Sequence, residues 1–290
     1  MEHIIENDYL KVKVADFGAE IRSVIRKADD REMMWQADSA FWGRTSPVLF
    51  PLVGNYYEKK SEYNGQIYEM GQHGFARDME FICLDERPNE ITFELISSDK
   101  THEKYPFDFS LVINYVLKDS TVQVNWKVKN EDSEIMYFSI GAHPAFNCNL
   151  NNSSLLFENG DEKCVEITAN VIASDGSGCL SDEQDRYELN DGILKMSDDL
   201  FSKDALVVEK QQADRVTLID ENGEVLVTVT CPTPLFGIWS PVGKHASFVC
   251  IEPWYGRCDR VGFNQKLQDR EYGNQLEAGK VFHAGYEMIF

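Results

Sequence analysis

The stretch FDFSLVINYVLKDSTVQVNWKV, residues 107–128, decides the fold class of this chain. Apolar side chains occupy alternate positions on both sides of the polar turn 118–120, namely Phe107, Phe109, Leu111, Ile113, Tyr115 and Leu117, then Val122, Val124, Trp126 and Val128. Successive side chains of a β-strand point to opposite faces, so this alternation buries one face and exposes the other. The stretch therefore predicts a long antiparallel β-hairpin.

The same alternation recurs from one end of the chain to the other, in residues 11–14, 91–95, 215–219 and 225–229. Between the last two segments, Asn222-Gly223 is expected to take the positive φ angles of a two-residue turn. Asn64-Gly65 has the same composition and lies between two further strand-like runs. The sequence therefore predicts two more hairpins.

Helical periodicity is nearly absent, and only residues 39–42 and 197–202 are candidates for short helices. The strands are separated by short turns and lack the long helices that parallel crossovers need. This pattern predicts an all-β fold of mainly antiparallel sheets, packed as a large β-sandwich. The polar segment 173–191 is predicted to be an exposed loop within a single domain that spans residues 1–290.

The charge of the chain limits its partners. The sequence holds 49 Asp and Glu against 28 Lys and Arg, which gives a formal net charge of −21. Nucleic acids and membrane surfaces are not expected as partners, because their phosphates repel such a protein. There is no run of about 18 apolar residues, and residues 1–8 lack the basic and apolar regions of a secretory signal. The expected location is the cytoplasm.

Seven cysteines form an odd set without a C-x-x-C pair, and several lie in apolar runs such as 248–251. This distribution favours reduced, mostly buried thiols over a disulfide framework. Zinc binding is the less favoured alternative, and no metal site is predicted.

Four polar or charged residues stand among glycines, prolines and aromatic residues, where a plain sheet would not place them: Arg44, His73, His143 and Glu252. Glycines around His73 allow a sharp turn or the close approach of a ligand, and Pro144 keeps His143 extended. Glu252 follows an apolar run, where burial would raise the pKa of its carboxyl group and make it a useful base. Plainer interpretations stay open: a surface ion pair for Arg44, an ordinary surface position for His73, and a carboxylate bonded to backbone N–H groups for Glu252.

Aromatic residues accompany these polar groups, namely Trp42, Phe75, Trp239, Trp254 and Tyr255. Sugars present C–H faces that pack on aromatic rings and hydroxyls that bind planar polar groups. The combination favours a carbohydrate ligand, although core packing explains most of these aromatic residues equally well.

Four motifs carry a family resemblance when they are taken in order. They are Arg44 before SPVLFP, His73 in GQHGFAR, His143 in GAHPAF and Glu252 in IEPW. Together they resemble the aldose 1-epimerase (mutarotase) family, and most closely the bacterial group associated with lactose and galactose operons. The resemblance extends over residues 7–290.

The resemblance implies a supersandwich whose concave face holds a sugar. It implies that Glu252 is the general base and His143 the general acid. By the same resemblance, His73 and Arg44 bind around the ring oxygen and its neighbouring hydroxyls, and Asp204 binds sugar hydroxyls. Trp239 is expected to contact the same substrate.

The implied chemistry is the interconversion of α and β anomers, which needs one base and one acid and no cofactor. The two groups are expected to face one cleft about 5–8 Å apart, with the sugar atoms O1 and O5 between them. Free hexoses such as galactose or glucose are the favoured substrates, and a hexose phosphate is the alternative. Two rival functions stay open: a glycosidase that uses Asp204 as a second carboxyl group, and a non-catalytic sugar-binding or sensor protein.

Overall fold

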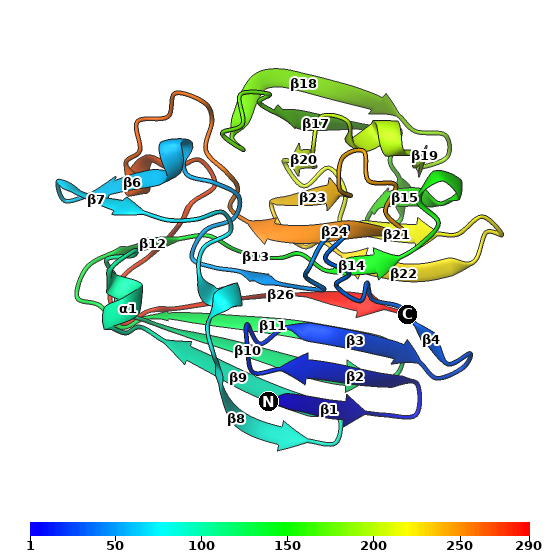
Figure 1. The fold of residues 1–290 in the computed structure, drawn as a ribbon, viewed down its shortest axis with the longest axis horizontal. Helices are drawn as coiled ribbons and strands as arrows, with labels where there is room; N and C mark the ends of the chain where they lie inside the picture. Colours follow the sequence, from blue (N-terminus) through cyan, green and yellow to red (C-terminus); the bar gives the residue numbers. More distant parts are fainter.

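The computed structural model describes residues 1–290, and nearly all of its regular structure is β-strand (Figure 1). One short α-helix, α1 (Asp99–His102), is present. Five single-turn 3₁₀ helices complete the set: η1 (Tyr57–Lys59), η2 (Ala76–Asp78), η3 (Leu150–Asn152), η4 (Asp198–Phe201) and η5 (Leu267–Asp269). None of these helices has the length and apolar character needed to cross a membrane.

The larger of the two main sheets has ten strands in the order β16-β15-β21-β22-β26-β11-β10-β9-β8, with β19 also paired to β15. Their bounds are β8 (Ile82–Arg87), β9 (Glu90–Ile96), β10 (Phe109–Lys118), β11 (Thr121–Asn130), β15 (Ser154–Asn159), β16 (Glu162–Lys163), β19 (Ile193–Lys195), β21 (Arg215–Ile219), β22 (Val225–Thr230) and β26 (Val281–Ile289). The predicted hairpin of residues 107–128 is confirmed, because β10 and β11 pair antiparallel and Lys118 lies opposite Thr121.

The second main sheet has eight strands in the order β18-β17-β20-β23-β24-β13-β5, and β14 also pairs with β24. Their bounds are β5 (Val48–Leu49), β13 (Ile140–Ala142), β14 (Ala145–Asn147), β17 (Glu166–Ile172), β18 (Leu180–Glu188), β20 (Leu206–Glu209), β23 (Leu235–Trp239) and β24 (Phe248–Tyr255). Every pair of neighbouring strands in this sheet is antiparallel.

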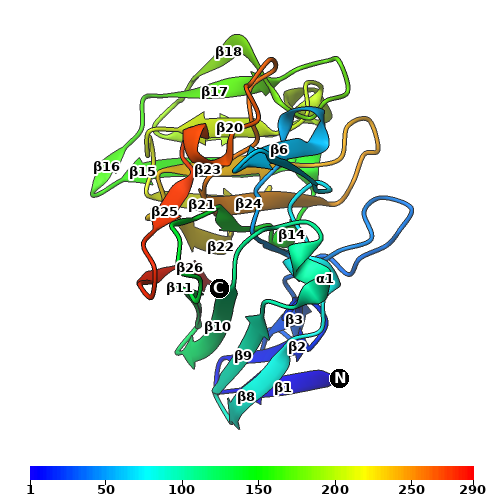
Figure 2. The ribbon, with the colours of Figure 1, turned by 90° about the vertical axis from the view of Figure 1, so that its left-hand side faces the viewer.

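Three small sheets complete the fold. Their strands are β1 (Glu2–Glu6), β2 (Leu10–Ala15), β3 (Ile21–Arg26) and β4 (Arg31–Glu32) in one sheet, β6 (Lys60–Tyr63) and β7 (Gln66–Glu69) in another, and β12 (Met136–Phe138) and β25 (Asn274–Leu276) in the third. In the view of Figure 2, β1, β2 and β3 lie beside β8, β9 and β10. The largest apolar core contains residues of β1–β3 and of both main sheets, such as Val12, Trp126 and Ile251. The predicted all-β, antiparallel sandwich is therefore confirmed.

The two Asn-Gly turns differ. Asn64 and Gly65 both have positive φ and join β6 to β7 as a two-residue turn, as predicted. The prediction of a two-residue turn at Asn222-Gly223 is wrong. The last residues that pair between β21 and β22 are Ile219 and Val225, and of the Asn-Gly pair only Gly223 has positive φ. The carboxylate of Asp220 instead accepts hydrogen bonds from the backbone N–H groups of Asn222 and Glu224, which stabilises a longer loop.

The prediction of an exposed loop at 173–191 is wrong for the second half of this segment, because Leu180–Glu188 forms the edge strand β18. The sequence does not reveal this strand because its side chains are mostly polar. An edge strand pairs through its backbone alone, and charged side chains protect its free edge from pairing with other chains. Residues 197–202 contain η4, as expected, whereas 39–42 form a turn without a helix.

Candidate active site

A cavity of about 310 Å³ is lined by residues of β17, β20, β23 and β24, four strands of the eight-stranded sheet. Five of the six site residues expected from the sequence are in its lining, namely His73, His143, Asp204, Trp239 and Glu252. Ligand pockets typically have about 300–1,000 Å³, so this cavity suits one small ring.

Strand alternation on β24 determines which side chains enter the cavity. Ile251 belongs to the main core, and its neighbour Glu252 points to the opposite face, where it lines the cavity. Glu252 lies in the middle of β24, opposite Gly237 of β23. A Cβ atom on Gly237 would lie 2.3 Å from the Trp254 ring, so the absence of a side chain there makes room for that ring.

His143 lies in the link between β13 and β14, and both strands pair with β24. Its ring stacks on Trp42, with ring centroids 4.7 Å apart, and meets the edge of Trp239. His143 Nε2 is 3.3 Å from Glu252 Oε2. The expected separation of about 5–8 Å is therefore wrong, because neighbouring strand segments bring the two groups into direct contact.

Burial controls the charge of this pair. Glu252 is 1% exposed, and burial, followed by the charge of Asp204, raises the pKa of its carboxyl group well above the usual value. Burial, followed by the positive charge of Arg77, lowers the pKa of His143 to about 3. His143 Nδ1 and Glu252 Oε2 are buried without a hydrogen-bond partner. Buried polar atoms are nearly always paired, so these two atoms are available to bond a ligand.

His73 enters the cavity from a tight turn in which it has a φ of 65°. Gly74 follows in the same left-handed region, and a Cβ there would lie 2.2 Å from the Phe50 carbonyl oxygen. The backbone N–H of Gly54 donates to His73 Nδ1 over 3.1 Å. Burial lowers the pKa of His73 well below its usual value, so the neutral ring carries its proton on Nε2 and offers it as a donor.

The arginine in the cavity is Arg77, and Arg44 is not in the lining. Arg44 donates to Asp78 Oδ1 over 2.7 Å, as the plainer surface interpretation expected, and its charge also lowers the pKa of both cavity histidines. The Arg77 side chain is 15% exposed, its Nε has no hydrogen-bond partner, and partial burial lowers its pKa to about 10. Arg77 stands four residues after His73 on η2, and this spacing was the sequence signal that could have identified it.

Asp204 lies at the rim of the cavity, where its Oδ1 accepts a hydrogen bond from the Ala205 N–H. Asp204 has no ion pair with any cation. Trp239 is the last residue of β23, and Trp42 packs against it with ring centroids 5.5 Å apart. The two rings make the aromatic wall of the cavity.

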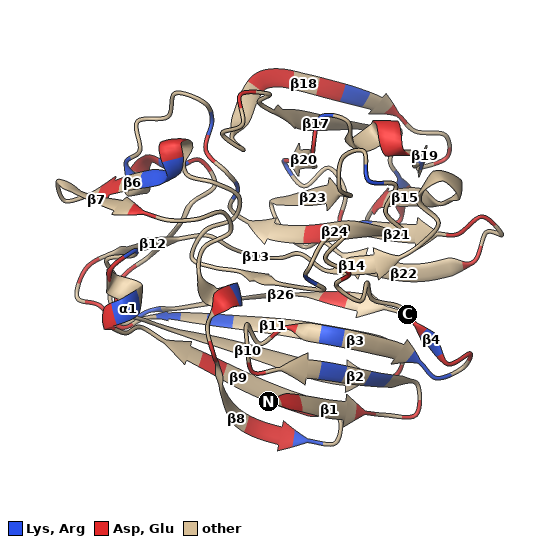
Figure 3. Cartoon of the chain, in the orientation of Figure 1, with Lys and Arg blue, Asp and Glu red and all other residues tan.

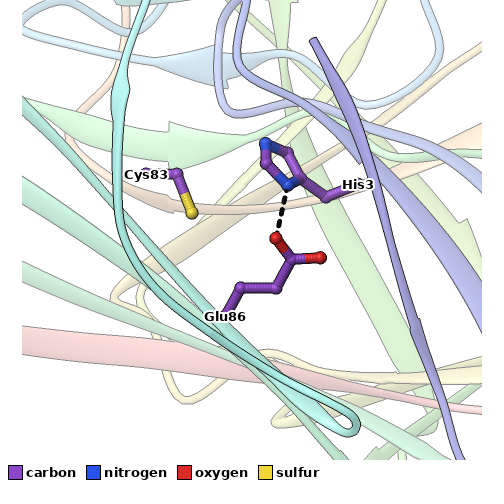
Figure 4. Close-up of side chains that lie close together, drawn as sticks. All are labelled: His3, Cys83 and Glu86. Atoms are coloured by element: carbon purple, nitrogen blue, oxygen red, sulfur yellow. Dashed lines mark hydrogen bonds and ion pairs between the residues drawn. The ribbon is translucent and has the colours of Figure 1, made fainter.

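Two groups of side chains bring three metal-binding donors within 4.8 Å of one another. One consists of His143, Cys250 and Glu252 in the cavity; the other consists of His3, Cys83 and Glu86 (Figure 4). The two ring nitrogens of His3 lie 2.8 Å from a Glu86 carboxylate oxygen and 2.7 Å from an Asp16 carboxylate oxygen, and despite partial burial these contacts raise the pKa of His3. Since both nitrogens already contact carboxylates, neither is left for a metal, and we interpret the second group as an ion-pair cluster.

The structure is thus a large antiparallel β-sandwich with a buried carboxyl–imidazole pair in a cavity on one of its sheets. The chain belongs to the aldose 1-epimerase family, whose model matches residues 2–265. It is similar to a galactose mutarotase related enzyme from Lactobacillus acidophilus, with 35% identity, a TM-score of 0.93 and coverage of 100% of this chain and 97% of that one.

Two further relatives also match nearly the whole chain. A galactose mutarotase-like protein from Lactobacillus casei is 28% identical with a TM-score of 0.90, and the match covers 100% of this chain and 99% of that one. The plasmid form of protein LacX from Lactococcus lactis subsp. lactis is 29% identical over 275 residues, which are 92% of this chain and 91% of that protein.

Proposed function

We propose that this protein is an aldose 1-epimerase that interconverts the α and β anomers of a free aldohexose by acid–base catalysis. The observation that carries the proposal is the contact between His143 and Glu252, 3.3 Å apart and buried in a cavity that suits one ring. Burying two titratable groups without pairing all their polar atoms costs free energy, which a substrate that binds between them would recover.

In the proposed reaction, Glu252 removes the proton from the C1 hydroxyl while His143 gives a proton to the ring oxygen O5. The C1–O5 bond breaks, and C1 becomes an aldehyde. Rotation about C1–C2 presents the other face of the aldehyde to O5. His143 then takes back the O5 proton, Glu252 returns its proton to O1, and the ring closes as the other anomer.

This cycle needs one proton on the pair, and burial favours that state. The raised pKa of Glu252 and the lowered pKa of His143 favour this proton on the carboxyl group before a substrate binds. Transfer to His143 produces the carboxylate and imidazolium that start the cycle, without any change in the total charge of the pair. Substrate hydroxyls that hydrogen-bond to the carboxylate would favour this transfer.

Other residues are proposed to bind the sugar. The Nε2–H of His73 and the guanidinium of Arg77 are donors for ring hydroxyls, and Asp204 is an acceptor. Trp239 and Trp42 offer ring surfaces to sugar C–H groups. Arg44 is proposed to act from outside the cavity, through its charge and its bond to Asp78.

The rival glycosidase has less support, because the partner of Glu252 is an imidazole and not a second carboxyl group. A test separates the enzyme from a sugar-binding protein: optical rotation is followed after α-D-glucose or α-D-galactose is freshly dissolved with and without the protein. We expect equilibration in proportion to protein concentration. A protein that binds these sugars without accelerating equilibration would overturn the proposal.

A further inference from the structure

The buried cluster of His143, Cys250 and Glu252 offers the nitrogen, sulfur and oxygen donors that zinc binds in proteins. One donor atom of each residue lies within 4.8 Å of the other two. We infer that this cluster binds a thiophilic divalent cation such as Zn²⁺ in competition with the sugar, and that the metal reversibly inhibits the enzyme. The metal site stands on the donors themselves, whereas the inhibition rests on the proposed epimerase function.

Strand pairing brings the three donors together. The strands β13 and β14 pair with β24 in one register, which places the link residue His143 opposite Glu252. Cys250 precedes Glu252 by two positions on β24, so strand alternation puts its side chain on the same face. The donors therefore come from hydrogen-bonded strands and from the short link between two of them.

The distances fit tetrahedral coordination. With Zn–N and Zn–O bonds of about 2.0–2.2 Å, two ligands of a tetrahedral zinc ion lie about 3.4 Å apart. His143 Nε2 and Glu252 Oε2 are 3.3 Å apart. A Zn–S bond of about 2.3 Å puts the sulfur about 3.6 Å from the other ligands, so Cys250 Sγ needs to approach them by about 1 Å.

The charges of the site suit a divalent cation. Zinc would take Cys250 as the thiolate and Glu252 as the carboxylate, releasing their protons to solvent, while neutral His143 adds no charge. Two negative ligands balance the metal, so the loaded site is neutral, as burial requires. The flanking strands β13, β14 and β23 hold no Lys or Arg (Figure 3), and the charges of Arg77 and Asp204 in the cavity lining are of opposite sign.

The donor set also selects the metal. A thiolate and an imidazole favour zinc over Mg²⁺ and Ca²⁺, which bind oxygen ligands. A bound metal would occupy the lone pairs through which Glu252 and His143 are proposed to exchange protons, and it would lie where the sugar binds. Inhibition should therefore be competitive with the sugar and be reversed by a chelator.

Metal binding by itself tests the site. Chelator-treated protein is titrated with Co²⁺, whose thiolate complexes absorb in the near ultraviolet, and Zn²⁺ is then added as a competitor. We expect a thiolate band that Zn²⁺ removes, that is lost in Cys250→Ser, and that is unchanged in Cys83→Ser of the surface cluster. A band that survives Cys250→Ser would overturn the inference, and so would the absence of a band in the wild-type protein.

Turnover connects the site to the proposed function. Anomer exchange of glucose is measured by NMR with Zn²⁺ or Mg²⁺ added. We expect Zn²⁺, but not Mg²⁺, to inhibit the wild-type protein, with less inhibition as glucose is raised and full recovery after EDTA is added. Failure of Zn²⁺ to inhibit, or equal inhibition by Mg²⁺, would overturn the inference.

The two cysteine variants locate the inhibition. Cys250 has no role in the proposed proton transfers, so Cys250→Ser should keep metal-free turnover near the wild-type rate, which shows that the variant is folded. A lost ligand should cost at least as much affinity as a lost outer-shell partner, so Cys250→Ser should need about 10²-fold more Zn²⁺ for the same inhibition. Cys83→Ser should be inhibited like the wild-type protein. Equal inhibition of Cys250→Ser and the wild type would overturn the inference. A cobalt band that depends on Cys250 in a protein that turns over no sugar would support the metal site and contradict the proposed function.

Discussion

The protein contains two clusters of the same three residue types. The surface cluster is His3, Cys83 and Glu86, and the buried cluster is His143, Cys250 and Glu252. In the surface cluster both ring nitrogens of the histidine are bonded to carboxylates, and its pKa is raised. In the buried cluster the histidine retains an unpaired nitrogen, and its pKa is lowered to about 3. The two clusters therefore contain the same residue types at similar distances from one another, and they differ only in the burial and hydrogen-bond partners of their side chains.

The difference shows what makes a titratable pair available for chemistry. A histidine whose two ring nitrogens both contact carboxylates has no nitrogen left for a substrate. Under the proposed function, a buried histidine and carboxyl group that share one proton are poised to exchange it with a substrate. The following predictions test whether the two clusters are functionally distinct.

The largest effect is expected for Glu252→Gln, which preserves the size of the side chain and removes the base. Under the proposed mechanism kcat should fall by about 10² or more. The matched control is Glu86→Gln in the surface cluster, which should leave kcat unchanged. Polarimetry of freshly dissolved α-anomers measures both. Comparable losses in the two variants would remove the distinction between the clusters.

The companion variant His143→Asn removes the acid and should cause a similar loss of kcat. Groups that act in one concerted step are not additive, so the double variant with Glu252→Gln should be little worse than the poorer single variant. If the double variant instead lost kcat by the product of the two single-variant factors, the two side chains would not act as a unit.

A smaller effect is expected for Gly237→Ala, which acts on the cavity through Trp254. Trp254 lines the cavity, and the added methyl group must displace its ring, because the Cβ would lie 2.3 Å from it. A shift of this ring should lower kcat/KM by about tenfold to 10²-fold. Gly71→Ala is the control, since nothing lies within 4 Å of its added methyl group. Equal activity of Gly237→Ala and the wild type would show that catalysis does not depend on the position of the Trp254 ring.

The pH dependence should be broad. Activity needs the Glu252–His143 pair to hold one titratable proton. It should fall at low pH, when His143 is protonated while Glu252 keeps its proton, and at high pH, when Glu252 loses its proton and the pair holds none. Because burial lowers the first pKa to about 3 and raises the second well above its usual value, kcat should stay level around neutral pH. Rates measured between about pH 4 and about pH 10, with spontaneous exchange subtracted, test this. A steep acid limb near pH 6.5, the ordinary histidine value, would show that the pair is not buried as described.

The smallest effect is expected for His3→Asn in the surface cluster. The pKa of His3 is raised in the folded protein, so its ion pairs stabilise the fold fully below about pH 6.5, and this contribution disappears as pH rises through the folded-state pKa. The variant should lose about 1 kcal/mol or less at acid pH and still less at alkaline pH, with kcat unchanged. Urea unfolding at two pH values measures this. A loss of activity without a loss of stability would assign the surface cluster a chemical role.

The fold was largely predictable from local patterns. The alternation in residues 107–128 predicted the β10–β11 hairpin, because burial of one strand face imposes a period of two on the sequence. The same signal failed for β18, whose exposed edge needs no apolar residues. The Asn222-Gly223 turn failed because the side chain of Asp220 organises a longer loop.

The sequence by itself also pointed to His73, His143, Trp239 and Glu252, which line the cavity, since glycine, proline and aromatic neighbours mark places where a sheet departs from its pattern. The family resemblance added Asp204, which also lies in the lining. Only the tertiary structure decided that Arg77 rather than Arg44 enters the cavity, and that His143 contacts Glu252 directly. The first outcome depends on the pairing of Arg44 with Asp78 outside the cavity, and the second depends on how strands that are distant in sequence are aligned. Local sequence patterns do not encode such pairing, because the hydrogen bond from Arg44 to Asp78 and the alignment of β13 and β14 with β24 arise only when the chain is packed.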